Sequence, residues 1–167
     1  LVVQLRFDST GVDTLMMRSE RLRAVETDTL RRMIATGSVR FWERRLAATA
    51  DSVIFERWGA GYRPEAAAAL VRRADTSGQR IRMYRDPMLW MRRNQITGDT
   101  LRMGGVGEAI DTLEVRSRAF VAAEDTVLER IHQLKGVRLN ARLTGEELEF
   151  VRVGPQAQAI RYLKEEN

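Results

Sequence analysis

Residues 89–103 read LWMRRNQITGDTLRM, and a shift of 48 residues places FWERRLAATADSVIF (41–55) on the same pattern. In this alignment Trp42 falls on Trp90, and the two Arg-Arg pairs coincide. Asp51-Ser52 also falls on Asp99-Thr100, so an acid followed by a hydroxyl residue occupies the same place in both copies. So many matches of uncommon residues in one alignment indicate a repeated unit. The alternating apolar residues on both sides of the Arg-Arg pair predict that each unit is a β-hairpin.

Weaker copies of the unit extend the pattern along the chain. In QLKGVRLNARL (133–143), Gly136 takes the place of Ala50 and Gly98, and SERLRAV (19–25) is a candidate fourth copy. The repeat therefore predicts a stack of similar hairpins.

The triplet Asp-Thr-Leu and its close variants recur through the chain, at 13–15, 28–30, 51–53, 99–101, 111–113 and 125–127. The acids at Asp51 and Asp99 start the outgoing strand of a unit, and those at Asp28 and Asp111 follow a turn and start the returning strand. Aspartate accepts backbone N–H bonds in turns, and a hydroxyl and a branched residue suit a strand. We expect these aspartates to lie at strand edges as turn caps, in a ladder along the stack, with no catalytic role.

Short segments with period-two alternation dominate the sequence, at 38–42, 50–57, 101–103, 112–115, 119–122, 137–143, 148–153 and 157–163. Turn-forming residues separate them at 8–11, 104–108 and 144–147. Single hairpins cannot bury their own apolar face, so they must stack or fold over. The fold class expected is all-β, with a repetitive antiparallel sheet pair that is open or closed into a jelly roll.

One segment departs from the strand pattern. PEAAAALVRRAD (64–75) opens with proline at a first helical position and continues through alanines, which favours a short helix. Glycines before it and Ser77-Gly78 after it bound an insert at 58–79. We expect residues 1–167 to form a single domain that carries this helical insert.

Composition excludes several classes of protein. Hydrophobic residues at 44% and charged residues at 31% are ordinary for a folded domain. No apolar run approaches the roughly 18 residues of a membrane-spanning helix. The absence of cysteine excludes disulfides, thiolate zinc sites and thiol nucleophiles. A start at Leu1 and the final KEEN (164–167) favour a trimmed segment of a longer chain, which would have lost any signal peptide.

The net charge of +5 is carried almost wholly by arginine, with lysine only at 135 and 164. This content fits either a solvated surface or an anionic partner, because guanidinium groups bind phosphate and carboxylate bidentately. Both nucleic acid and lipid phosphates qualify as such a partner, and the two explanations stay open.

Four segments carry a further pattern: DPMLWMRRNQITGDTLRM (86–103), IDTLEVRSRAFVAAED (110–125), QLKG (133–136) and QAIRYLKEEN (158–167). Together they resemble the OstA-like family of organic-solvent-tolerance and lipopolysaccharide-transport periplasmic proteins, in particular its Bacteroidetes-like branch. The resemblance extends from about residue 18 to 167, and the 58–79 insert and the arginine content depart from the family pattern.

The resemblance implies a β-jelly-roll or V-shaped β-taco of two antiparallel sheets that holds lipopolysaccharide acyl chains inside. It also implies a periplasmic location and partners: lipopolysaccharide or a related lipid, the other jelly-roll components of the transport bridge, and a second copy joined head to tail. We expect no enzymatic activity, no cofactor, no metal and no nucleic acid partner.

Ten apolar residues share the repeated inward face, and they are the candidates to line a lipid groove: Val39, Phe41, Val53, Phe55, Leu89, Leu101, Met103, Val115, Val121 and Leu139. The alternative is that they pack against each other as a closed core. The two Arg-Arg pairs near the hairpin tips are candidate phosphate contacts or parts of solvated turns: Arg44, Arg45, Arg92 and Arg93.

Other motifs indicate structure more than chemistry. GGVG (104–107) lacks the Lys-Ser/Thr of a phosphate loop, so a glycine hairpin is expected. His132 is the only histidine, and no nucleophile elbow accompanies it. Trp42 and Trp90 fall opposite Phe41 and Leu89, so either a bulge reorients them or they pack beneath the insert helix.

Two alternative functions belong to other classes. A basic β-sheet that binds nucleic acid would interleave aromatic and basic residues on an exposed strand face. A carbohydrate-acting β-solenoid enzyme would need a convergent cluster of carboxylates, and no pair of acids in the sequence stands out for acid-base chemistry.

Overall fold

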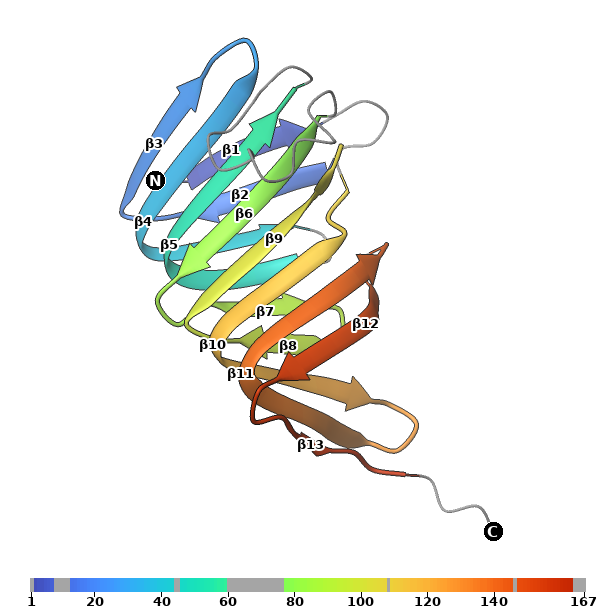
Figure 1. The fold of residues 1–167 in the computed structure, drawn as a ribbon. Helices are drawn as coiled ribbons and strands as arrows, with labels where there is room; N and C mark the ends of the chain where they lie inside the picture. Colours follow the sequence, from blue (N-terminus) through green and yellow to red (C-terminus); the bar gives the residue numbers. More distant parts are fainter. Residues whose placement is uncertain are drawn as a thin grey trace.

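The computed structural model describes residues 2–7, 13–43, 46–59, 77–107, 109–145 and 147–163 (Figure 1). Every regular element in these ranges is a β-strand, and all strand pairs are antiparallel. The strands are β1 (Val2–Phe7), β2 (Asp13–Arg18), β3 (Arg21–Glu26), β4 (Leu30–Glu43), β5 (Leu46–Trp58), β6 (Gly78–Tyr84), β7 (Met88–Met91), β8 (Asn94–Thr97), β9 (Thr100–Val106), β10 (Thr112–Asp125), β11 (Arg130–Thr144), β12 (Glu147–Gly154) and β13 (Gln158–Ile160). The all-β, antiparallel class expected from the sequence is confirmed.

Four long strands, β4, β5, β10 and β11, bend and so belong to two sheets. The first sheet has the order β3, β4, β5, β6, β9, β10, β11 and β12. The second has the order β1, β2, β4, β5, β7, β8, β10, β11 and β13 and uses the other halves of the long strands. The two sheets face each other across the bend, as the strands of Figure 1 show.

Six strands close into a barrel at the centre of the molecule. β5 pairs with β6 and β7, β10 pairs with β9 and β8, and the pairs β6–β9 and β7–β8 complete the circuit. Each of these six strands has a hydrogen-bonded neighbour on both sides, which leaves no open edge within the barrel. The remaining strands extend the two sheets beyond it on either side.

The strands turn from one sheet to the other along a line that we call the corner. Residue pairs in the left-handed region make the turns there: Gly37 with Ser38 in β4, Arg85 with Asp86 between β6 and β7, and Ser117 with Arg118 in β10. In β4 and β10 the pairing shifts across these residues, so each pair forms a β-bulge that sharpens the bend.

Both copies of the repeated unit adopt the same path. The first copy forms the end of β4 and β5, which pair with each other, and the second forms β7, a turn, β8 and β9. In each copy the aligned acid, Asp51 or Asp99, lies at the corner, and Gly136 marks the corresponding bend of β11. The sequence repeat therefore corresponds to a repeated bent hairpin.

The predicted insert lies mostly outside the described residues, as does the helix expected at 64–75. β5 ends at Trp58 and β6 begins at Gly78, so the described strands reach the first and last residues of the 58–79 segment. The expectation for the two tryptophans needs revision. Trp42 and Trp90 are neither turned inward nor placed beneath a helix in the described part of the chain. They follow strict alternation and lie on the outer face of the second sheet, 39% and 37% exposed.

Candidate functional sites: the apolar interior, the corner and the arginine face

The apolar interior lies between the two sheets and forms one continuous cluster. In the second sheet a row of inward residues crosses five neighbouring strands, with Phe41 beside Ala48, Leu89, Ile96 and Val121 in turn. In the first sheet a matching row crosses β4, β5, β6, β9 and β10, from Ala35 through Val53, Met83 and Leu101 to Val115. Alternation with period two places both rows on the facing sides of the sheets.

All ten residues selected from the sequence are members of this cluster, and their exposed fractions lie between 0% and 6%. They are therefore in contact with other side chains, as the closed-core alternative describes. Lipid contact at these ten positions stays a prediction.

The interior continues beyond the barrel onto β11 and β12, where it is less well covered. Leu134, Leu148, Val151 and Val153 pack against the core but are only partly buried. Sequence reasoning missed this face because β12 contains an irregularity. Leu143 pairs with Leu148 and Arg142 with Phe150, so one extra residue, Glu149, turns Phe150 outward and Val151 inward.

Arg92 and Arg93 lie in the turn between β7 and β8, at the rim of the second sheet, as expected of hairpin tips. The Arg92 side chain forms an ion pair with Glu147 at the start of β12, which belongs to the rim of the first sheet. The Arg93 Nη1 donates a 2.7 Å hydrogen bond to Thr126 Oγ1. Arg92 therefore links the ends of the two sheets that lie away from the corner, the β7–β8 turn of the second sheet and the start of β12 in the first. Arg44 and Arg45 lie outside the described residues.

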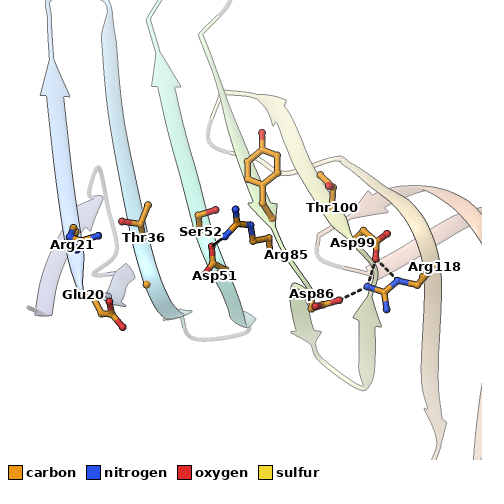
Figure 2. Close-up of a pocket in the computed structure, with 12 residues that line it drawn as sticks. Glu20, Arg21, Thr36, Asp51, Ser52, Arg85, Asp86, Asp99, Thr100 and Arg118 are labelled. Atoms are coloured by element: carbon orange, nitrogen blue, oxygen red, sulfur yellow. Dashed lines mark hydrogen bonds and ion pairs between the residues drawn. The ribbon is translucent and has the colours of Figure 1, made fainter.

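A polar groove of about 1020 Å³ runs along the corner and is lined by both acids and arginines (Figure 2). Asp51 lies 3.4 Å from Arg85 Nη1. Arg118 reaches both Asp86 and Asp99, and the hydrogen bonds to Asp99 and then to Asp86 raise the pKa of its guanidinium above its usual range. These charges therefore neutralise one another across neighbouring strands.

This arrangement revises the role expected for the repeated aspartates. Asp51 and Asp99 do lie in a ladder along one edge, but their carboxylates pair with arginines instead of capping their own turns. Asp125 does cap its turn, because its Oδ1 accepts the N–H groups of Val127 at 2.9 Å and Leu128 at 3.0 Å. The bond from Leu128, followed by that from His132, lowers the pKa of the Asp125 carboxyl.

His132 takes part in the same turn. Its Nε2 lies 3.1 Å from Asp125 Oδ2, and its Nδ1 accepts the N–H of Tyr162 at 3.2 Å. An acceptor at Nδ1 means that Nε2 carries the proton donated to Asp125. The histidine thus ties the β10–β11 turn to the segment after β13.

The glycine run GGVG belongs to the end of β9 and the connection to β10, as expected for a hairpin. Gly107 has a φ of +65°. A side chain at Gly105 would collide with the carbonyl of Ala109, so this glycine is required by a close approach of the backbone.

The outer face of the first sheet carries a dense array of arginines that the sequence analysis did not identify. Cross-strand pairing from β3 to β12 places three rows of side chains on this face. We call it the arginine face, after its ten arginines: Arg21, Arg23, Arg32, Arg80, Arg82, Arg102, Arg116, Arg138, Arg142 and Arg152. The same rows contain two acids, Glu56 and Glu114. Strand alternation would have predicted each outward arginine, but only the pairing register shows that they share one face.

Neither a metal centre nor a membrane-spanning helix is found in the described residues. They contain no group of three or more histidine, aspartate or glutamate side chains placed to hold a metal ion. They also contain no helix that is long and apolar enough to cross a bilayer.

Comparison with known proteins adds no relative: no family model matches the sequence, and no curated protein matches it either.

Proposed function

We propose that this chain is a non-enzymatic lipid-binding domain that takes acyl chains between its two sheets, and that it acts in the periplasm in lipopolysaccharide transport. The single observation that carries the proposal is the partly buried apolar surface on β11 and β12, which continues the core beyond the closed barrel. The resemblance of residues 86–103 and 110–125 to OstA-like proteins supports the same function and supplies the choice of lipid.

Lipid would enter most easily beyond the barrel. Within the barrel, inward side chains such as Leu89, Leu101 and Val115 are fully buried, so an acyl chain there would have to separate the sheets. At Leu134, Leu148, Val151 and Val153 part of the apolar surface is still exposed to solvent. Burying a methylene group contributes about 0.8 kcal/mol, so a chain of about a dozen carbons could contribute on the order of 10 kcal/mol before ordering costs.

The Arg92–Glu147 ion pair is consistent with such a path. It joins the rims of the two sheets at the start of β12, beside the partly buried surface. An exposed ion pair contributes only about 0–1 kcal/mol, so it can open without unfolding the domain.

Photo-crosslinking to lipopolysaccharide tests the proposal. A photoreactive residue at Leu134 or Val151 faces inward, and one at Ile160, 52% exposed and on the outer face of the second sheet, is the control. We expect labelling of the lipid from Leu134 and Val151 and little from Ile160. Equal labelling from all three positions, or labelling from Ile160 alone, would show that the lipid does not occupy the interior.

A further inference from the structure

We propose that the arginine face docks the domain onto the phosphate-bearing surface of an anionic lipid membrane. The proposal does not depend on lipid entering the interior, because it concerns the opposite side of the first sheet.

The first support is the imbalance of charge on this face. Glu56 Oε1 accepts from Arg32 at 2.8 Å, and Glu56 Oε2 lies 2.8 Å from Arg82 and 3.4 Å from Arg80. Glu114 lies 2.7 Å from Arg116 and 3.9 Å from Arg102. Two carboxylates thus serve five arginines. The other five, which include Arg138, Arg142 and Arg152, form no ion pair among the described residues.

The second support is that three arginines of the face are already held in place. Glu56 is only 3% exposed, so it holds its three arginines from below and fixes where their guanidinium groups lie. A set of cations held in place loses less side-chain entropy when an anion binds. By contrast, the two rows nearest the corner on the outer face of the second sheet hold three cations, Arg18, Arg40 and Lys135, against seven arginines in the two rows nearest the corner on the arginine face.

The shape of the array fits a plane of phosphates. The arginines occur in three rows that cross the neighbouring strands of the first sheet. Because neighbouring strands lie about 4.8 Å apart, its eight strands extend over about 34 Å. Exposed apolar residues lie at both ends of one row, Val25 at 38% and Phe150 at 53%. A basic face flanked by apolar side chains is typical of a surface that rests on anionic head groups.

Nucleic acid fits this face less well. Single strands are held by bases that stack on exposed aromatic rings. Trp58, beside the arginine face on the same side of the sheet, is covered by the guanidinium of Arg80 at 5.6 Å. This indole is therefore already occupied by one of the protein's own cations.

Vesicle flotation tests the proposal, with the whole chain and vesicles of phosphatidylcholine with or without about 30% phosphatidylglycerol. We expect binding to the anionic vesicles only, and loss of binding as salt rises. The variant Arg138→Gln/Arg142→Gln/Arg152→Gln removes three exposed arginines of the face. Since each basic residue contributes about fivefold to membrane partitioning, it should weaken binding by tenfold or more.

The matched control is Arg18→Gln/Arg40→Gln/Arg161→Gln, which removes the same charge from exposed positions outside the face. It should change binding by less than about threefold. Thermal melts of both variants should overlay that of the parent, because all six side chains are exposed.

Three results would overturn the proposal. The first is equal binding to neutral and anionic vesicles, and the second is equal weakening by the two triple variants. The third is salt-dependent retardation of a labelled DNA strand or duplex that is tighter than vesicle binding and lost in the face variant, which would assign the face to nucleic acid. None of these results bears on crosslinking from Leu134 or Val151, so the two proposals fail separately.

Discussion

Gly98 and Gly136 lie at the corner where a neighbouring strand comes too close for a side chain. A Cβ at Gly98 would fall well inside contact distance of Val115 Cγ1, and one at Gly136 would lie 2.5 Å from Val153 Cγ1. Ala50, at the aligned position of the first copy, is buried at 7% exposed, so that position accommodates a methyl group. The small residue in the repeat is therefore a packing requirement whose strictness differs between copies.

We expect Gly98→Ala to lower the free energy of unfolding by about 1–3 kcal/mol, because the added methyl overpacks the corner against Val115. Gly59→Ala is the matched control, since a Cβ there meets nothing within 4 Å. Denaturation in guanidinium chloride measures both. An equal effect of the two substitutions would contradict the packing explanation.

Asp125 should make the stability of the β10–β11 turn depend on pH. Its folded pKa is lowered, chiefly by the N–H of Leu128 and then by His132, relative to an unfolded value of about 3.9. Its stabilising contribution is therefore fully present above that value and is lost as the pH falls through the folded pKa. The parent should be more stable than Asp125→Asn near neutral pH, and the difference should shrink toward zero at about pH 2. Denaturation curves at a series of pH values measure this, and a constant difference would contradict it.

At the scale of the element, local sequence patterns predicted the positions of strands and hairpins but not which strands pair with each other. Alternation identified parts of β4, β5 and β9 to β13, and the copy of 41–55 at 89–103 predicted hairpins, without their bend. The pairings that close the barrel, β5 with β7 and β8 with β10, join segments far apart in sequence, and alternation does not specify partners. The inward face of β12 depends on the irregularity at Glu149, because alternation alone would place Phe150 on the same side as Leu148.

The candidate sites follow the same division. The ten inward residues were predictable because period two sorts the two faces of any strand. The acid-arginine pairs of the corner were not, because Asp99 meets Arg118 only after β10 has crossed beside the turn from β8 to β9. Likewise, the arginines around Glu56 come from β4 and β6, and only the register brings them together.

Glu56 should contribute more to stability than any other acid on the arginine face. It is almost fully buried and faces three arginines, so Glu56→Gln leaves Arg32, Arg80 and Arg82 without a counter-charge. We expect a loss of about 2–3 kcal/mol in the free energy of unfolding, because the arginines themselves remain partly solvated.

Glu114→Gln is the control for Glu56, since its side chain is 26% exposed and its pairs with Arg102 and Arg116 are open to water. That change should cost no more than about 1 kcal/mol. Chemical denaturation of both variants decides between the two roles, and a larger loss for Glu114→Gln would contradict the importance of the buried carboxylate.

At the scale of the whole molecule, the closed barrel and the flanking strands should differ in local stability. Barrel strands such as β5 and β10 are paired on both sides over a fully buried core, whereas β3, β12 and β13 are each paired on one side only. Local opening requires less free energy where fewer hydrogen bonds and apolar contacts are broken. Amide hydrogen exchange should therefore be slowest in the barrel and fastest in β3 and β13.

The same difference predicts where lipid acts, because a ligand slows exchange most in the segments that it holds closed. With lipopolysaccharide, amides of β12 and β13 should exchange more slowly while those of β9 and β10 change little, since the partly buried residues Leu134, Val151 and Val153 line that part of the interior. The deacylated polysaccharide is the control, because it keeps the sugars and lacks the acyl chains. Equal protection by both molecules would place recognition on the sugar and not in the apolar interior. Faster exchange in β9 and β10 with the intact lipid would mean instead that the acyl chains separate the sheets of the barrel itself.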